Sequence, residues 1–218
     1  MKRVILTGAS EGLGFELSKL LLKKDIEVIA LCRQKPSCDV VHIETDLSSD
    51  ESIKEAIEKI KNDYSKFDVL INCADVLSVK PLDKIDSDEL ENLFKVNVLS
   101  QIKLVSGLLS LIKKNESDIV NVGSTVGLKA YTDQCAYGSS KWAVRGTTKN
   151  LQLELGKTKC RVIGFNPGGF KSTLFEKATG QKVNLEGFME PIELAKLMIQ
   201  ILELPKTLEV SEIEINRK

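Results

Sequence analysis

Seven short runs of apolar residues recur along the chain, and the segments between them carry apolar residues at helical spacing. The runs are continuous rather than alternating, which is typical of strands that are covered on both faces. They lie at residues 4–7, 28–31, 40–43, 69–72, 119–122, 162–165 and 213–215. We therefore predict about seven strands in one buried sheet.

Helical patterns follow most of these strands. Phe15, Leu17, Leu20 and Leu21 form an apolar stripe after the first strand. Further helices are predicted over residues 49–64, 90–111, 141–155 and 191–202, the first preceded by capping residues and the last beginning with a proline. Alternation of strands and helices predicts a doubly wound parallel sheet with helices on both faces, that is, a three-layer α/β fold.

The composition changes this picture little. Hydrophobic residues make up 42% and charged residues 28% of 218, which suits a packed core and is too apolar for disorder. No linker, repeat or low-complexity stretch is visible, so residues 1–218 are interpreted as a single domain. Lysine and arginine (31) balance aspartate and glutamate (31), which argues against nucleic acid or an anionic membrane as the partner.

The cysteines and the N-terminus bear on the compartment. Five scattered cysteines without a CxxC pair argue against a disulfide framework and favour a reducing, cytoplasmic setting. The apolar run after Arg3 is too short for a signal peptide, and no run approaches the roughly 18 residues of a membrane span. With a single histidine, no metal site is expected.

A glycine-rich turn follows the first strand directly. Its glycines are Gly8, Gly12 and Gly14, in the spacing G-x-x-x-G-x-G. The first permits a tight turn, the second lets a pyrophosphate approach the backbone, and the third lets the next helix pack against the strand. Free N–H groups at the start of that helix would bind phosphate. No Gly-Lys-Ser/Thr follows, so a phosphate loop of the nucleotide-hydrolase kind is not supported.

Together with the motifs that follow it, this turn resembles the short-chain dehydrogenase/reductase family, in its compact single-domain branch. The resemblance covers nearly the whole chain, and the order of the motifs is far more specific than any one of them. The motifs are Thr7-Gly8-Ala9-Ser10-x-Gly12-x-Gly14, Asp46-Leu47, Asp68-Val69-Leu70-Ile71-Asn72-x-Ala74, Val96-Asn97-Val98, Ile119-Val120-Asn121-Val122-Gly123-Ser124, Tyr137-Gly138-Ser139-Ser140-Lys141 and Asn166-Pro167-Gly168-Gly169.

The resemblance implies a Rossmann fold that binds a nicotinamide dinucleotide, and a catalytic tetrad of Asn97, Ser124, Tyr137 and Lys141. It also implies a homodimer or homotetramer in which the helices that carry Asn97 and Tyr137 pair across a two-fold axis. The residues expected to contact the cofactor are Gly8, Ser10, Glu11, Gly12, Leu13, Gly14, Arg33, Asp46, Leu47, Asn72, Ala74, Tyr137, Lys141, Pro167, Gly168, Phe170, Ser172 and Thr173.

Tyr137 and Lys141 are four residues apart, so one helical face presents both. An ordinary tyrosine has a pKa near 10, and a fixed ammonium beside it is expected to lower that pKa. Tyr137 would then exchange a proton with a carbonyl or alcohol oxygen that Ser124 holds, while hydride passes to or from the nicotinamide. The family implies that Asn97 holds a water that connects Lys141 to solvent.

The end of the second strand bears on the choice of cofactor. An acidic residue there would bind the ribose 2′-hydroxyl of NAD, but this chain has Cys32 followed by Arg33. A guanidinium can bind a 2′-phosphate, so NADP is preferred, with NAD possible. Glu11 opposes this preference, because many NADP-preferring relatives carry a basic residue there.

One residue departs from the family pattern. Where the family usually has Asn-Asn-Ala-Gly after the fourth strand, this chain has Asn72-Cys73-Ala74-Asp75. If the position needs a positive φ, an aspartate tolerates it better than most residues but not freely. Asp75 also brings a carboxylate near the cofactor, where it could weaken binding or shape the site.

Two functions therefore stand side by side. The first is an NADP(H)-dependent oxidoreductase that interconverts a carbonyl and an alcohol of a small molecule. The second is a catalytically weak dinucleotide-binding sensor or scaffold of the same fold, for which Asp75 leaves room. A nucleotide-sugar epimerase is disfavoured, because no length remains for a sugar-binding lobe.

Overall fold

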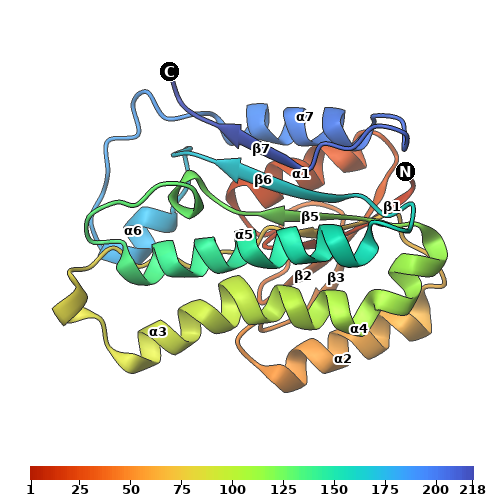
Figure 1. Cartoon of the computed structure of the whole chain (residues 1–218), viewed down its shortest axis with the longest axis horizontal. Coiled ribbons are helices and arrows are strands. Elements are labelled where there is room, and N and C mark those ends of the chain that lie inside the picture. The colour runs from red at the N-terminus through yellow and green to blue at the C-terminus, as the bar shows by residue number, and fades with distance from the viewer.

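A seven-stranded, entirely parallel sheet forms the centre of the protein in a computed structural model that covers residues 1–218 (Figure 1). The strand order is β3-β2-β1-β4-β5-β6-β7, so the chain winds outward from β1 in one direction and then outward from β4 in the other. The strands are β1 (Arg3–Thr7), β2 (Glu27–Cys32), β3 (Val41–Glu44), β4 (Val69–Asn72), β5 (Asp118–Val122), β6 (Val162–Pro167) and β7 (Glu212–Ile215). The predicted seven-stranded sheet and its parallel topology are confirmed.

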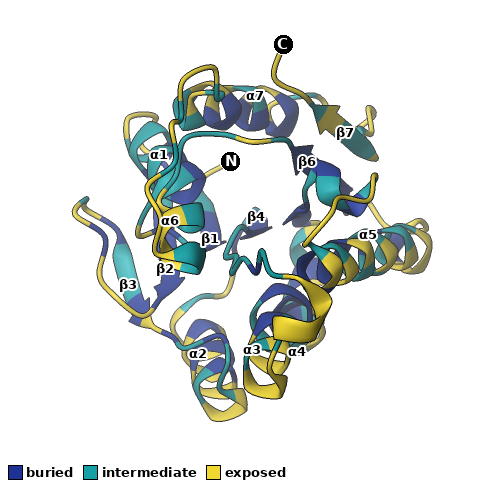
Figure 2. Ribbon diagram, turned by 90° about the vertical axis from the view of Figure 1, so that its left-hand side faces the viewer, coloured by how far each residue is buried: buried dark blue, intermediate teal, exposed yellow.

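Helices cover both faces of the sheet, which completes the three predicted layers (Figure 2). One face carries α1 and α7, which contact each other, and the other carries α2, α4 and α5. The helices are α1 (Gly12–Leu22), α2 (Asp50–Asp63), α3 (Ser87–Phe94), α4 (Ser100–Asn115), α5 (Cys135–Leu155), α6 (Leu174–Thr179) and α7 (Pro191–Leu202), with the short turns η1 (Leu82–Lys84), η2 (Lys95–Leu99) and η3 (Thr125–Gly127).

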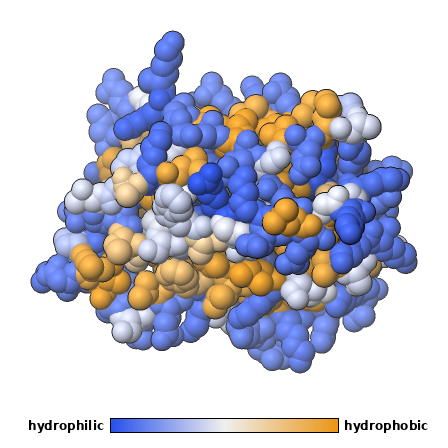
Figure 3. Space-filling model, viewed as in Figure 1, coloured by the Kyte–Doolittle hydropathy of each residue, from blue (hydrophilic) through white to orange (hydrophobic).

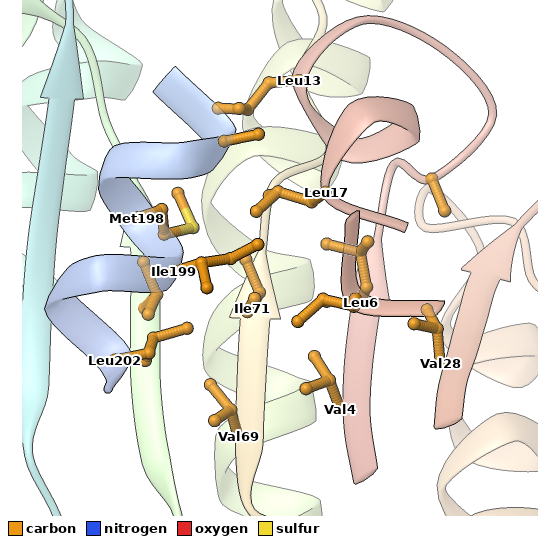
Figure 4. Close-up of a cluster of buried hydrophobic side chains, with 14 of the residues drawn as sticks. Val4, Leu6, Leu13, Leu17, Val28, Val69, Ile71, Met198, Ile199 and Leu202 are labelled. Carbon is orange, nitrogen blue, oxygen red and sulfur yellow. The ribbon is translucent and has the colours of Figure 1, made fainter. Parts of the chain in front are cut away.

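Alternate residues of each strand supply two separate cores. Val4 and Leu6 of β1 pack toward α1 and α7, whereas Ile5 packs toward α2 and α4. Figure 4 shows the first of these cores, where Leu17 and Ile199 meet above the sheet. Because both faces of the central strands are buried, most of their positions are apolar, which explains the nearly continuous apolar runs in the sequence. Each fully buried valine, leucine or isoleucine side chain contributes roughly 1.5–3 kcal/mol to the free energy of unfolding.

Several helix boundaries agree with the sequence pattern. Ser49 caps α2 by accepting a hydrogen bond from the Ser52 N–H at 3.3 Å, and α7 spans Pro191–Leu202 as predicted. The helix predicted over residues 90–111 begins earlier, at Ser87, and contains a π-helical turn, η2, before it continues as α4.

The helix predicted over residues 141–155 begins six residues earlier, at Cys135. Its first turns bury Tyr137, Ser140 and Lys141, which are polar. The apolar pattern therefore starts late in this helix, because its buried face is polar where it borders the candidate site.

The helical stretch Ser87–Asn115 is long and apolar enough to cross a membrane, and 44% of its most apolar window is buried inside the protein. Leu104, Leu108 and Ile112 of this stretch belong to the core beneath the sheet. Packing within the protein thus accounts for part of its apolar character.

Candidate active site

The site lies where the winding of the sheet reverses, between the neighbouring strands β1 and β4. Open α/β sheets bind ligands at the carboxyl ends of their strands at such a switch point. The two chain segments that leave these strands are joined by Thr7, whose hydroxyl accepts hydrogen bonds from the N–H groups of Cys73 (2.9 Å) and Ala74 (3.0 Å). The glycine-rich turn and the segment of Asp75 are therefore held together.

The glycines of the turn meet distinct steric demands. Gly8 has φ +70°, and a Cβ there would lie 2.7 Å from the Ala74 Cα. A Cβ at Gly14 would lie 2.2 Å from the Gly8 carbonyl oxygen, so only glycine lets α1 pack this close to the turn. Gly12 has φ +56° and open space around it, with nothing nearer than 3.8 Å to an added Cβ.

A cavity of about 800 Å³ opens from this turn across the carboxyl edge of the sheet. Both Ser124 and Tyr137 line it. So do most of the residues predicted to contact a cofactor, namely Gly8, Ser10, Glu11, Gly12, Leu13, Gly14, Arg33, Asp46, Leu47, Ala74, Pro167, Gly168, Phe170 and Ser172.

Three predicted cofactor residues do not line the cavity, namely Asn72, Thr173 and Lys141, whose side chain is fully buried. Asn72 is fully buried in the sheet, and its amide donates to the Asn121 Oδ1 at 2.9 Å. The Thr173 hydroxyl donates to the Glu11 carboxylate. The side chains of Asn72 and Thr173 therefore serve contacts within the protein.

The tetrad residues meet at one wall of the cavity. Tyr137 and Lys141 lie on the inner face of α5, 6% and 1% exposed, with the Lys141 Nζ 5.5 Å from the centre of the Tyr137 ring. Ser124 follows β5 and lies close enough to Tyr137 to act to lower the pKa of its phenol. Tyr137 and Lys141 lie one turn apart on α5, and the end of β5 places Ser124 beside them. These three polar side chains therefore lie close together.

Asn97 holds a neighbouring segment of chain. It lies in the π-helical turn η2 and is fully buried. Its side chain accepts from the Val76 N–H and donates to the Val76 carbonyl oxygen, both at 2.8 Å, and it donates to the Ser140 hydroxyl at 3.2 Å. The side chain of Asn97 thus fixes the residue that follows Asp75.

Asp75 lies between the tyrosine and the lysine. The Tyr137 hydroxyl donates to Asp75 Oδ2 at 2.8 Å, and the Lys141 Nζ lies 3.1 Å from Asp75 Oδ1. The remaining short contact of the ammonium group is the Val122 carbonyl oxygen at 3.4 Å. Asp75 therefore contacts both the Tyr137 hydroxyl and the Lys141 ammonium. In the family pattern a glycine takes the place of Asp75, so no side chain stands between these two groups.

This arrangement corrects the expectation that Lys141 lowers the pKa of Tyr137. Burial, the negative charge of Asp75 and the hydrogen bond to it raise the pKa of Tyr137 well above its usual value, although the hydrogen bond with Ser124 acts to lower it. Burial also raises the pKa of Asp75, although the Lys141 charge and the Tyr137 hydroxyl act to lower it. The carboxylate offsets the charge of Lys141 and keeps the proton on the phenol.

The backbone at Asp75 does not meet the condition considered for it, a positive φ. The non-glycine residues with positive φ are Asp25, Glu116 and Asp133, so Asp75 does not need the conformation that a glycine favours. The position is compatible with a side chain, and the substitution acts through its carboxylate rather than through backbone strain.

The far end of the cavity is lined by charged and polar groups. Arg33 is exposed there, and its charge acts to lower the pKa of both Glu11 and Asp46. The Asp46 carboxylate accepts from the N–H (2.9 Å) and the hydroxyl (2.7 Å) of Ser48. Glu11, whose negative charge opposes a 2′-phosphate, is paired with Lys177 and accepts from the Thr173 hydroxyl, so part of its charge is offset.

Residues 170–189, here called the lid, border the cavity, and two of the groups on this side, Phe188 and Arg217, are not among the predicted site residues. The base of the lid is closed where Phe170 pairs with Met189, and α6 lies within it. Phe188 lines the cavity and carries the Arg217 guanidinium 4.7 Å above its ring. Arg217 follows the seventh parallel strand, and that position at the carboxyl edge is the signal that could have found it.

With this geometry established, comparison with known proteins identifies the family. Residues 2–183 match the family described as short chain dehydrogenase. Carbonyl reductase family member 4 of Xenopus laevis is 30% identical over 211 residues, which cover 91% of this chain and 89% of that protein. The chain belongs to the short-chain dehydrogenase/reductase family, a family of oxidoreductases.

Solved structures have the same fold. An alcohol dehydrogenase from the archaeon Thermococcus sibiricus, complexed with 5-hydroxy-NADP, matches with a TM-score of 0.87 at 23% identity, over 99% of this chain and 96% of that one. A 4-hydroxyisoleucine dehydrogenase complexed with NADH matches with a TM-score of 0.89 at 24% identity, over 100% and 98%. At these identities the likeness establishes the Rossmann fold.

Proposed function

We propose that the protein interconverts a small carbonyl compound and its alcohol with a nicotinamide dinucleotide as hydride carrier. One observation carries the proposal. The Tyr137 hydroxyl, with Ser124 beside it and Lys141 behind it, faces the same cavity as the glycine-rich turn. Such a cavity can hold a dinucleotide and a substrate so that the reacting atoms meet at Tyr137.

The residues of the turn fit a dinucleotide. Gly12 leaves open space at the start of α1, and no side chain caps that helix. Its free N–H groups and the positive end of its dipole suit a pyrophosphate. When bound, the nicotinamide would supply or accept the hydride.

Each residue of the tetrad then has a role. Ser124 would hold the substrate oxygen as negative charge develops on it, and Tyr137 would exchange a proton with that oxygen. Buried Lys141 would bind the nicotinamide ribose, and Asn97 would fix the wall of the site through Val76. The side chains of Leu47 and Asp46 would border the adenine.

The preferred cofactor is NADP. Arg33 is exposed in the cavity and can bind a 2′-phosphate bidentately. The pairing of Glu11 with Lys177 removes part of the repulsion that would oppose it. NAD stays possible, and the two solved relatives described above carry a cofactor of each type.

The test is NADPH oxidation with a panel of aldehydes and ketones, with binding followed separately by NADPH fluorescence. Tyr137→Phe should bind NADPH as the wild type does and lose about 10²–10⁴-fold in turnover. Arg33→Ala should weaken NADPH binding and spare NADH binding. Full turnover by Tyr137→Phe would overturn the assignment of Tyr137.

The second candidate is a dinucleotide-binding sensor with weak catalysis. It is favoured by the hydrogen bond that the Tyr137 hydroxyl donates to Asp75, because this bond engages the proton that catalysis would transfer. It predicts NADPH binding without turnover of any carbonyl in the panel. The same two assays therefore separate the candidates.

The exterior of α4 and α5 supports a homo-oligomer. Ile102 on α4 and Trp142 and Leu153 on α5 are 42%, 48% and 82% exposed. Figure 3 shows apolar areas on the face that these helices turn outward. We expect a dimer or tetramer joined through this face, which light scattering would measure; a monomer at micromolar concentration would contradict it.

A further inference from the structure

The structure assigns to Asp75 a role in the proton path. We propose that Asp75 is the group that takes up and returns the proton of Tyr137, so that substrate oxygen, Tyr137 and Asp75 form a relay. This inference rests on the proposed carbonyl–alcohol interconversion. Asp75 would act through Tyr137, as a positioning residue, and would not itself touch the substrate.

The hydrogen-bond geometry requires such a partner. Tyr137 has one hydroxyl proton, and it is directed to Asp75 Oδ2 at 2.8 Å. While Asp75 is a carboxylate, that proton is not available to a carbonyl oxygen in the cavity. If Asp75 carries a proton, its O–H can donate to the Tyr137 oxygen, and the tyrosine proton can turn toward the substrate.

The relay balances in both directions. In reduction, hydride adds to the carbonyl carbon, the carbonyl oxygen takes the Tyr137 proton, and the Tyr137 oxygen takes the proton from Asp75 Oδ2. Asp75 ends as a carboxylate paired with Lys141 at 3.1 Å, and it regains a proton from solvent. In oxidation, every transfer runs in reverse, and Tyr137 accepts the alcohol proton without passing through a free phenolate.

The surroundings of Asp75 suit this exchange. Its side chain is 21% exposed and lines the cavity, so solvent can reach it, whereas the Lys141 side chain is fully buried. Asp75 Oδ1 faces the Lys141 ammonium at 3.1 Å and Oδ2 accepts from the Tyr137 hydroxyl, and a carboxylate oxygen has lone pairs for more than one donor. Asn97 holds Val76 on both its N–H and its carbonyl, which fixes the backbone next to Asp75.

The titratable groups that face Asp75 are few. Tyr137 and Lys141 approach from α5, and Cys73 lies on its own segment. Burial raises the pKa of Cys73 to about 12, so this thiol is uncharged near neutral pH. Asn97 from η2 and Ser124 after β5 carry no charge. Asp75 and Tyr137 therefore titrate as a coupled pair beside the charge of Lys141.

The first test needs neither cofactor nor substrate. With ¹³Cζ-tyrosine labelling, the chain gives three tyrosine signals, from Tyr64, Tyr131 and Tyr137, and Tyr137→Phe identifies the third. In the wild type the Tyr137 signal should stay in the phenol form through alkaline pH. In Asp75→Asn and in Asp75→Gly, it should ionise lower by about one pH unit or more. Coincident titrations in wild type and both variants would overturn the proposal.

The second test follows turnover of a carbonyl with NADPH. The wild-type rate of reduction should fall about tenfold per pH unit above the ionisation of Asp75, and its dependence on the D₂O fraction should be curved, because two protons move. Asp75→Asn should lose that pH limb and show a linear dependence. A linear dependence in the wild type would overturn the relay.

The two tests separate this proposal from the proposed function. Shifted titrations without turnover of any carbonyl would overturn the proposed function and leave Asp75 as the residue that holds the Tyr137 proton. Turnover by the wild type with unshifted titrations would support the proposed function and overturn the relay.

Discussion

Two carboxylates at opposite edges of the sheet, Asp118 buried and Asp75 partly buried, are paired with cations in different ways. Asp118, at the start of β5, accepts from Arg161 at Nε (3.2 Å), at a terminal guanidinium nitrogen (2.7 Å) and at the backbone N–H (3.0 Å), and it is also paired with Lys206. Asp75, after β4, accepts from the Tyr137 hydroxyl at one oxygen and faces the Lys141 ammonium at the other, so it has fewer donors than Asp118.

The difference extends to the cations. Arg161 also donates to the carbonyl oxygens of Leu202, Leu204 and Leu208, so the pair at Asp118 ties β5, β6 and the end of α7 together with nearly every polar atom satisfied. Lys141 has Asp75 and one distant carbonyl. A saturated pair stabilises the fold, whereas an incompletely satisfied pair beside a cavity retains the capacity to exchange protons and bind ligands.

The largest expected effect is on the saturated pair. Asp118→Asn leaves the Arg161 guanidinium buried without its counter-charge and should lower the free energy of unfolding by about 3–5 kcal/mol. Urea denaturation measures this. Lys206→Met is the matched control, because the Lys206 side chain is 43% exposed and its loss should cost only about 1 kcal/mol or less. If Asp118→Asn were as stable as Lys206→Met, the ion pair between Asp118 and Arg161 would not stabilise the fold in the way proposed here.

A smaller effect with a distinct pH dependence is expected at Asp75. Burial raises the pKa of Asp75 in the folded protein, so the folded state keeps this proton to higher pH than the unfolded chain, whose aspartate titrates near about 3.9. As the pH rises between the unfolded and the folded pKa of Asp75, the unfolded chain loses this proton more readily, so the equilibrium shifts toward unfolding. The stability of the wild type relative to Asp75→Asn should therefore fall as pH rises, by at most about 1.4 kcal/mol per pH unit.

Urea denaturation of both proteins from pH 5 to pH 8 checks this trend, and Asp68, followed from about pH 5 down to about pH 2, supplies a control of opposite sign. Burial acts to raise the pKa of Asp68, but hydrogen bonds from the N–H groups of Lys2 and Arg3 hold it below its usual value. Its contribution is present above the unfolded pKa and is lost as pH falls through the folded pKa. A wild-type stability that rises with pH relative to Asp75→Asn would refute the prediction.

The smallest effect is expected at the lid. Lys177 of α6 pairs with Glu11 of the glycine-rich turn, and the two side chains are 61% and 43% exposed. Lys177→Met should leave global stability almost unchanged. It should speed cleavage of the lid by a protease specific for aromatic residues up to about fivefold at low salt, because exposed pairs contribute about 1 kcal/mol or less.

High salt should abolish that difference, since it screens exposed charges. Lys182→Met, at an exposed lysine of the same lid that has no ion pair, should behave as the wild type does. Equal cleavage of all three proteins at low salt would show that the pair with Glu11 does not hold the lid.

Much of the fold follows from the sequence because burial on both faces imposes a continuous apolar pattern. Six of the seven strands contain their predicted ranges, and β3 is displaced by one residue. The start of α5 was missed because Tyr137, Ser140 and Lys141 make its buried face polar. The π-helical turn at Asn97 leaves no trace in the apolar spacing, since it depends on the packing of a polar side chain against Val76.

The order of motifs along the chain, read residue by residue, determined the family, the parallel sheet and the set of candidate site residues, because each depends on local spacing. Only the tertiary structure decided what Asp75 does, since its partners lie 62 and 66 residues away and meet it where β4 ends beside α5. A pattern along the chain records which residues are polar. Which of those residues share a proton depends on distances of about 3 Å that only the folded chain defines.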